Sequence, residues 1–248
     1  IMNNFLTKYL FELKKKFPDP ESELRSLIKK SLKTKKEIIL SNFNINNINF
    51  SFFNKSFKRR MNNEPISKIF NSKSFWKYDF FVNEDVLDPR PETEIIIEKV
   101  LDFYPEKNKK LKILDMCTGS GCLAVSVAKE YKNAQITATD ISIDAIKVAK
   151  INAKKFNCYN RINFIKCDLF NQSKVFDIVI SNPPYLSEIE YSNTSRDIRL
   201  FEGTNTVQSG YFCFKSLGIA DNIPQSPIPL AVLITVNFLL SKYSSGIL

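Results

Sequence analysis

Apolar residues in the first 40 positions recur at helical spacing. Leu24, Leu27 and Ile28 lie three or four residues apart, which predicts a helix with one apolar face. We therefore expect residues 1–72 to form a small all-α domain. The aromatic-rich stretch 73–94 predicts a hairpin and linker that lead into the rest of the chain.

From residue 111 onward, short apolar runs alternate with helical stretches. The runs predict four strands, at Lys112–Met116, Gln135–Ala138, Ile162–Ile165 and Phe176–Ile180. The stretches predict helices at Cys122–Tyr131 and from Ser142 to about Phe156, the second with Ile143, Ile146, Ala149 and Ala153 facing inward. This strand–helix–strand order with short turns predicts an α/β fold around a parallel sheet.

Polar residues stand where these predicted strands end. They are Asp115, Asp140, Asp168 and Asn182. Parallel sheets of this kind bind their ligands at the carboxyl ends of the strands. The sequence therefore predicts a binding site at that edge of the sheet.

The first of these ends is the turn Asp115-Met-Cys-Thr-Gly-Ser-Gly121. Its glycines allow a tight turn and a close approach to a ligand. The turn lacks the lysine of a phosphate-binding loop and the spacing of a dinucleotide turn. Its acidic residue disfavours pyrophosphate and favours a cationic or hydroxyl-rich ligand, although a simple helix-entry turn would look the same.

Asp140 follows Asp115 by 25 residues. An acidic residue at the end of the second strand can accept hydrogen bonds from both hydroxyls of a ribose. The alternative is that Asp140 only caps the helix predicted at 142–156.

The segment Ser181-Asn182-Pro-Pro-Tyr185 follows the fourth predicted strand. Its two prolines stiffen the backbone and remove two N–H donors. The Asn182 side-chain oxygen and the Pro183 carbonyl can then accept both hydrogens of a planar NH2 group, on whose face Tyr185 can pack. Such positioning would direct the nitrogen toward an electrophile without a general base; the alternative is a proline-stiffened turn.

Charge is distributed unevenly along the 248 residues. Residues 1–70 contain 15 Lys and Arg against 6 Asp and Glu, whereas residues 71–248 contain 21 against 20, within a net charge of +10. A basic first section favours a docking surface for RNA or a ribonucleoprotein, and solvated helix faces are the alternative.

Absent residue types exclude several chemistries. The chain has no histidine, which excludes Ser-His-Asp and Cys-His catalysis and most zinc sites. Its five cysteines include no C-x-x-C pair, so we expect no metal site and no disulfide scaffold. The longest apolar run, 228–240, is interrupted by Pro229 and Asn237 and is shorter than the ~20 residues that span a bilayer. We expect a protein of the cytoplasm or an organelle matrix, without membrane contact.

Taken together, the turn at 115–121, Asp140 and Asn-Pro-Pro-Tyr at 182–185 resemble S-adenosylmethionine-dependent amino-methyltransferases. These enzymes act on nucleic-acid bases and on glutamine side chains of proteins. Residues 75–94, which contain Asp-Pro-Arg-Pro-Glu-Thr-Glu, are similar to the segment before the methyltransferase domain of the HemK/PrmC family, the peptide chain release factor glutamine methyltransferases. Arg59-Arg60 and the following Glu-Pro-Ile also resemble that family's interdomain region.

The resemblance covers about residues 19–200 and implies a Rossmann-like class I methyltransferase domain over 95–248, with S-adenosylmethionine as cofactor. Its implied cofactor-binding residues are Asp115, Cys117, Thr118, Gly119, Ser120, Gly121, Asp140, Asp168, Leu169 and Asn182. Its implied substrate-binding residues are Arg90, Glu92, Asn182, Pro183, Pro184 and Tyr185, of which Asn182, Pro183 and Tyr185 would be catalytic. The substrate implied is the glutamine of the Gly-Gly-Gln motif in class 1 release factors, near the ribosome, with residues 1–72 recognising that protein.

The sequence departs from the family pattern at Cys117, where a third glycine is usual, and at Asp88, where an apolar residue is usual. We expect Cys117 to conflict with the cofactor or with the backbone of its turn. One strong strand candidate, 230–240, follows Tyr185, so we expect the domain to be incomplete after about residue 203. Two alternatives stay open: a nucleic-acid amine methyltransferase, and an inactive remnant of the family.

Overall fold

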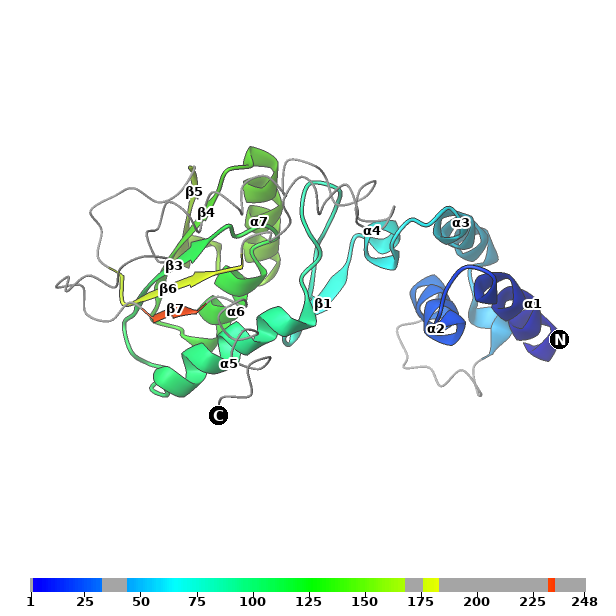
Figure 1. Cartoon of the computed structure of the whole chain (residues 1–248), viewed down its shortest axis with the longest axis horizontal. Coiled ribbons are helices and arrows are strands. Elements are labelled where there is room, and N and C mark those ends of the chain that lie inside the picture. The colour runs from blue at the N-terminus through cyan, green and yellow to red at the C-terminus, as the bar shows by residue number, and fades with distance from the viewer. Residues whose placement is uncertain (1, 33–43, 168–175, 183–231, 235–248) are drawn as a thin grey trace, which may run out of the picture. The chain divides into compact units, whose positions relative to one another are not determined.

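The structure, a computed structural model, describes residues 2–32, 44–167, 176–182 and 232–234 of the chain. The chain divides into two compact units, Ile1–Asn71 and Ser72–Leu248 (Figure 1). Each unit has its own apolar core.

The first unit is helical. Its elements are α1 (Met2–Lys14), α2 (Pro20–Ser31), the short η1 (Ile45–Asn47), α3 (Phe50–Met61) and α4 (Ile66–Phe70). Helix α2 begins where the Asp19 carboxylate accepts the N–H of Ser22 at 3.0 Å, which satisfies one of the free donors of the first turn. The apolar face predicted at Leu24, Leu27 and Ile28 is fully buried, and it packs with Phe53 of α3.

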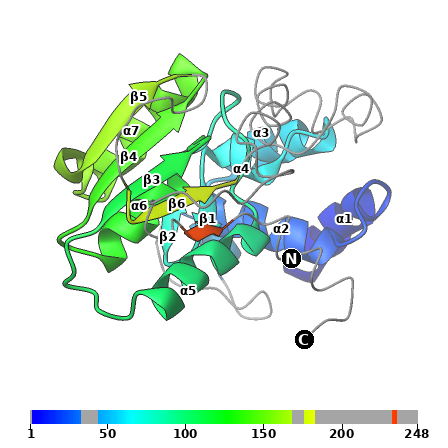
Figure 2. The same ribbon diagram turned by 60° about the vertical axis from the view of Figure 1, so that its left-hand side comes forward.

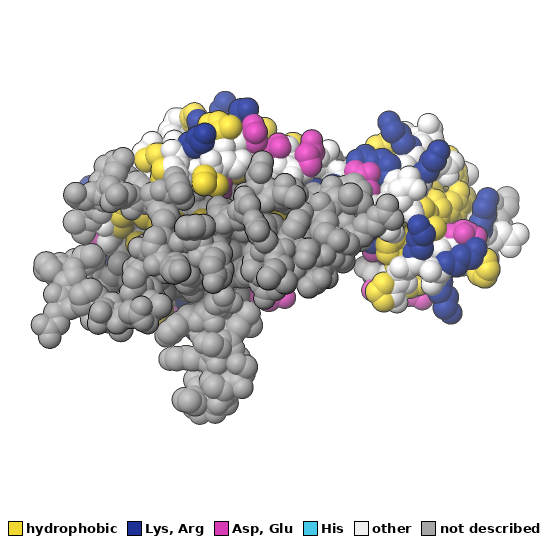
Figure 3. Space-filling model, turned by 45° about the horizontal axis from the view of Figure 1, so that its top comes forward, with side chains coloured by type: hydrophobic (Ala, Val, Ile, Leu, Met, Phe, Trp, Pro, Cys, Tyr) yellow, Lys and Arg dark blue, Asp and Glu magenta, His cyan; other side chains and the backbone are white. Residues whose placement is uncertain are grey.

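Two arginines of α3 stabilise this unit from within. Arg60 is 8% exposed and donates two hydrogen bonds to Glu23 of α2, at 2.7 and 2.8 Å. Its guanidinium also lies 3.8 Å from the centre of the Phe17 ring. Arg59 pairs with Glu64. A buried charge needs such partners to offset its desolvation, so the bonds to Glu23 keep Arg60 paired inside this unit. Other Lys and Arg side chains stand on its surface, at the right of Figure 3.

The second unit begins with a hairpin and continues with alternating strands and helices. Its elements are β1 (Lys73–Phe75), β2 (Tyr78–Phe80), η2 (Pro91–Thr93), α5 (Glu94–Phe103), β3 (Lys112–Met116), α6 (Cys122–Glu130), β4 (Gln135–Asp140), α7 (Ile143–Lys155), η3 (Tyr159–Arg161), β5 (Ile162–Lys166), β6 (Ile178–Ser181) and β7 (Val232–Ile234). The hairpin expected within 73–94 is formed by β1 and β2, which pair antiparallel.

The main sheet has the order β5-β4-β3-β6-β7, and every neighbouring pair is parallel. Along the chain these strands are the third, second, first, fourth and fifth of the sheet, which is the doubly wound Rossmann order. The predicted α/β fold with a parallel sheet is therefore confirmed. Strand β7 lies within the run 230–240 that predicts a strand. The expectation of an incomplete domain concerns the residues after about 203, which lie outside the described part except for β7.

Residues of each strand alternate between two faces of the sheet. Ile113 of β3 and Ile178 of β6 belong to the main core, to which α5, α6 and α7 contribute their buried side chains. Their neighbours Leu114 and Val179 pack in a separate cluster on the opposite face. Figure 2 shows β5, β4, β3 and β6 side by side, with α5 below β6 and β7 in that view. This packing fixes the carboxyl ends of β3, β4 and β6 beside one another.

Helix α7 agrees with its predicted inner face at Ile146, Ala149 and Ala153, which are buried. Ile143 is 45% exposed, so its predicted inward position is wrong. It occupies the first position of the helix, just after the Ser142 cap, and its side chain falls outside the stripe that meets the sheet.

The turn from β3 into α6 passes very close to α7. A Cβ on Gly121 would lie 3.0 Å from the Ala149 Cβ and 3.1 Å from its Cα, and φ at Gly121 is +77°. A Cβ on Gly119 would meet no atom of the described part of the chain within 4 Å, although φ there is +51°.

We expect Gly121→Ala to lower the free energy of unfolding by about 2 to 4 kcal/mol, because it adds a backbone clash to the strain of positive φ. Gly119→Ala is the matched control and should cost about 1 kcal/mol, from strain alone. Urea denaturation of both variants measures the difference. Equal losses would show that the contact with α7 does not constrain the turn.

Candidate active site

The turn between β3 and α6 folds around the carboxylate of Asp115. Asp115 is fully buried, and its Oδ2 accepts the Thr118 hydroxyl at 2.6 Å and the N–H of Ala124 at 3.1 Å. The N–H of Thr118 in turn donates to the carbonyl of Thr139 in β4, at 2.9 Å. These bonds close the turn and tie it to the neighbouring strand.

A buried asparagine fixes the same turn from the side of α7. Asn152 is fully buried, and its Nδ2 donates to the carbonyl of Ser120 at 2.8 Å and to that of Phe81 at 2.9 Å. Its Oδ1 accepts the N–H of Phe81 at 2.7 Å. The sequence reasoning did not select Asn152; its signal is a lone amide on the otherwise apolar face of the helix.

Asp140 lies at the end of β4 and faces the turn. Its Oδ2 accepts the N–H of Gly119 at 2.8 Å and its Oδ1 accepts the N–H of Ser142 at 2.9 Å. The cap of α7 is Ser142, whose hydroxyl accepts the N–H of Ala145 at 3.2 Å. Asp140 therefore binds the backbone of the turn at Gly119, and it is Ser142 that caps the helix.

Burial raises the pKa of both carboxylates. Desolvation raises the pKa of Asp115 to about 7, against the hydrogen bonds from Thr118 and Ala124, and the charge of Asp140 adds to the rise. Desolvation also raises the pKa of Asp140, which the N–H groups of Ser142 and Gly119 oppose. A cationic ligand would stabilise the ionised forms of these two carboxyl groups, so the site favours a cation over an anion.

The residues present fit S-adenosylmethionine. The Asp115 Oδ1 is buried and accepts no hydrogen bond from the described residues. Each Asp140 oxygen accepts one backbone N–H and keeps further lone-pair capacity for ribose hydroxyls. No atom of the described residues lies within 4 Å of where a Cβ on Gly119 would stand, which leaves room there for a ligand to approach the backbone. Among the described residues, no group of three or more His, Cys, Asp or Glu side chains forms a metal site.

Cys117 occupies the turn with φ +57°, a conformation that favours glycine. Its side chain packs against the apolar cluster of Leu114, Met116 and Phe176. The backbone strain expected at this position is present, and the thiol has apolar neighbours on the face of the sheet away from the main core.

Asn182 follows β6 at the point where the strand order of the sheet reverses. Ser181 is opposite Met116 of β3, and its hydroxyl donates to the Met116 carbonyl at 3.0 Å. The Asn182 side chain donates through Nδ2 to the hydroxyl of Thr93, at 2.8 Å. The end of β6 thus lies beside the Asp115 turn, at the place where doubly wound sheets bind ligands.

The remaining predicted residues divide into two groups. Arg90 and Glu92 are exposed on either side of Pro91, whereas Thr93 is 1% exposed and is the residue of this segment that reaches Asn182. Those outside the described part of the chain are Asp168, Leu169, Pro183, Pro184 and Tyr185.

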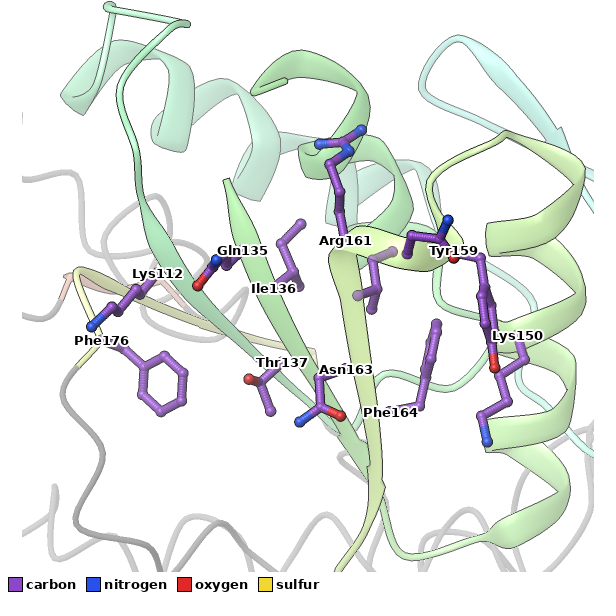
Figure 4. A pocket seen from close by; sticks show the side chains of 12 residues that line it. Lys112, Gln135, Ile136, Thr137, Lys150, Tyr159, Arg161, Asn163, Phe164 and Phe176 are labelled. Carbon is purple, nitrogen blue, oxygen red and sulfur yellow. The ribbon is translucent and has the colours of Figure 1, made fainter. Parts of the chain in front are cut away.

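A pocket lies elsewhere in this unit, along β4 and β5 (Figure 4). Its lining residues are Lys112, Gln135, Ile136, Thr137, Lys150, Tyr159, Asn160, Arg161, Ile162, Asn163, Phe164 and Phe176. They include the first residues of β3, β4 and β5 and none of the predicted site residues. The pocket is therefore separate from the site at the carboxyl ends of the strands.

The family described as methyltransferase small domain matches residues 92–205. A release factor glutamine methyltransferase from Buchnera aphidicola is 35% identical over 204 residues, which cover 81% of this chain and 73% of that protein. Another from Clostridium acetobutylicum is 42% identical over 142 residues, 56% of this chain and 50% of that protein. The fold and the Asp115 turn define a class I methyltransferase. The chain belongs to the family of the release factor glutamine methyltransferases, as the resemblance predicts.

The chain also resembles longer proteins. A bifunctional methyltransferase from Rickettsia bellii is 36% identical over 219 residues, which are 74% of this chain and 39% of that protein. Across four Rickettsia proteins of this description, the chain spans 30 to 45% of their length. A solved S-adenosylmethionine-dependent methyltransferase from Agrobacterium tumefaciens has a TM-score of 0.38 at 21% identity, over 46% of this chain and 39% of its own. This likeness is too weak to support an argument beyond the observed strand order.

None of the described helices is long and apolar enough to cross a membrane.

The raised pKa of Asp115 predicts a pH-dependent stability. Between its ordinary pKa of 3.8 and about 7, the folded state keeps a proton that the unfolded chain has lost. Stability should therefore fall as pH rises through this window and stay level above it. We expect the melting temperature of the wild type to fall more between pH 5 and pH 8 than that of Asp115→Asn. Asp140 is present in both proteins, and because its charge adds to the pKa of Asp115, the difference between the curves reports Asp115 together with this coupling. Parallel curves would contradict the buried state of Asp115.

Proposed function

We propose that this chain transfers a methyl group from S-adenosylmethionine to the side-chain amide nitrogen of a glutamine, the one in the Gly-Gly-Gln motif of class 1 release factors. The observation that carries the proposal is the position of Asn182, at the end of β6 and beside the Asp115 turn. Membership in the family supports it, because two relatives are described by that activity.

The residues of the turn would hold the cofactor. Asp140 would accept its ribose hydroxyls, and the open space beside Gly119 would admit it against the backbone. When bound, S-adenosylmethionine would supply an electrophilic methyl group, with the S–C bonding pair left on sulfur, and the proton released from the methylated amide nitrogen would pass to solvent water. The buried carboxylates Asp115 and Asp140 favour a positive ligand over an anion.

Asn182 would hold the substrate amide. A planar NH2 group donates two hydrogen bonds, and the Asn182 Oδ1 and the Pro183 carbonyl would accept them, with Tyr185 packed on the amide face. An amide nitrogen is a weak nucleophile, so the contribution of these residues is orientation and not proton removal. This division fits a chain that has no histidine to act as a base.

The helical first unit would engage the release factor. Residues 1–70 carry 15 basic against 6 acidic side chains, and part of this charge stands on the surface (Figure 3). Such a surface suits a protein that meets its substrate near ribosomal RNA. Activity on release factors would place the chain in the cytoplasm, or in the matrix of an organelle that translates its own messages.

The cofactor site is tested by calorimetric titration with S-adenosylmethionine. We expect the wild type to bind it and Asp140→Ala to bind at least about tenfold more weakly, because hydrogen bonds from the ribose to a charged group are lost. Asp144→Ala is the matched control, since this carboxylate stands in the first turn of α7 and pairs with Lys147. Equal loss in both variants, or no binding by a folded wild type, would contradict the assignment and favour an inactive remnant.

The reaction is tested with labelled S-adenosylmethionine and a purified class 1 release factor. We expect label on the glutamine of Gly-Gly-Gln, none on a release factor with Ala at that glutamine, and at least about a hundredfold loss in Asn182→Ala, as is typical of a residue that positions the reacting group. RNA and DNA serve as competing substrates. Methylated adenine or cytosine without methylated glutamine would overturn the proposal in favour of a nucleic-acid amine methyltransferase.

A further inference from the structure

A hydrogen bond joins two segments that are 89 residues apart, from the Asn182 Nδ2 to the Thr93 Oγ1, at 2.8 Å. Thr93 is 1% exposed and Asn182 is half-buried. The bond is therefore largely shielded from water, where a hydrogen bond constrains its partners more strongly than at a surface.

The Thr93 hydroxyl does not cap α5. Thr93 is the residue before α5, but its φ of −69° and ψ of −19° are helical, whereas a capping Ser or Thr usually has an extended backbone. Here no side-chain cap is formed, and the hydroxyl accepts from Asn182 instead.

Thr93 is itself held firmly. It ends the short η2 helix, where its N–H donates to the Arg90 carbonyl at 3.0 Å. Helix α5 continues from it and is anchored in the main core by Ile96 and Ile97, both fully buried. Its branched β-carbon also restricts the rotation of the side chain.

The other end of the bond has a fixed backbone. Ser181 pairs with Met116 in the sheet and donates its hydroxyl to the Met116 carbonyl. This places the Cα of Asn182, and the bond to Thr93 is a contact that orients its side-chain amide. Because the amide is planar, anchoring Nδ2 on one side decides the direction in which Oδ1 points.

We propose that Thr93 is a positioning residue: its hydroxyl accepts from Nδ2 and so restricts the rotation of the Asn182 amide, with Oδ1 directed away from Thr93 and toward the substrate. The inference rests on the proposed function, in which Oδ1 accepts an N–H of the glutamine amide. With the amide reversed, two NH2 groups would face each other and the substrate would lose its acceptor. Thr93 touches neither substrate nor cofactor in this role and acts only through Asn182.

The test compares Thr93→Val, which keeps the shape and removes the hydroxyl, with Thr93→Ser, which keeps the hydroxyl. Thr137→Val, on β4 and outside the site, is the matched control. We expect Thr93→Val to lower kcat about tenfold, the equivalent of one lost hydrogen bond, with KM within about twofold and unchanged affinity for S-adenosylmethionine. Thr93→Ser should restore kcat, and thermal denaturation should show all variants folded.

A second readout does not depend on activity. The side-chain NH2 resonances of Asn182, assigned by their loss in Asn182→Asp, should move in Thr93→Val toward the positions of a solvated amide and stay unchanged in Thr137→Val. A kcat in Thr93→Val within twofold of the wild type, or unmoved resonances, would overturn the inference. If the wild type methylates no glutamine, the proposed function fails by itself, and the resonances still decide whether Thr93 orients Asn182.

Discussion

Asp115 is buried from water near the carboxyl end of β3, the middle strand of the sheet. The geometry of the site follows from the hydrogen bonds that its carboxylate accepts. Asp115 accepts the Thr118 hydroxyl and the Ala124 N–H, so the chain has to turn back over it directly after β3. Burial disfavours the charged form of Asp115 and raises its pKa to about 7. A turn closed in this way exposes the backbone of Gly119 on one side and directs α6 into the core on the other.

The neighbouring elements hold that turn in place. Strand β4 contributes the Thr139 carbonyl and the Asp140 carboxylate, and α7 contributes the amide of Asn152 and the close approach of Ala149 to Gly121. Asn152 also binds the backbone of Phe81, just after the hairpin. One buried side chain thus connects the segment after the hairpin to the turn between β3 and α6, so a displacement of that segment would alter the turn.

The end of β6, where the proposed function places the substrate, is built from segments distant in sequence. β6 brings Asn182 beside the Asp115 turn through its pairing with β3, and the segment before α5 brings the Thr93 hydroxyl to the Asn182 amide. The first of these contacts is made by backbone and depends little on the identity of the side chain. The second depends on one hydroxyl, which gives the segment that precedes the sheet a part in the chemistry at its edge.

Much of this protein could be predicted from local pattern. The strands β3, β4, β5 and β6, the helix α7 with its Ser142 cap, and the alignment of Asp115, Asp140 and Asn182 at one edge follow from periodicity and from the rule for parallel sheets. Each of these features depends on residues close together in the chain. Periodicity predicts Ile143 to face inward, but this residue at the start of α7 is exposed.

Tertiary structure decided which polar groups meet. The sequence offered Arg90 and Glu92 in the segment before α5, yet the buried Thr93 between them and α5 is the residue that reaches Asn182. Asn152 lies within an apolar pattern that gives no sign of its hydrogen bonds. For Asp140 the sequence allowed two roles, the cap of α7 or a ligand of a ribose, and the structure gives the cap to Ser142. Periodicity reports which face of an element is buried, but a hydrogen bond between segments depends on the packing of the whole sheet, which no local pattern contains.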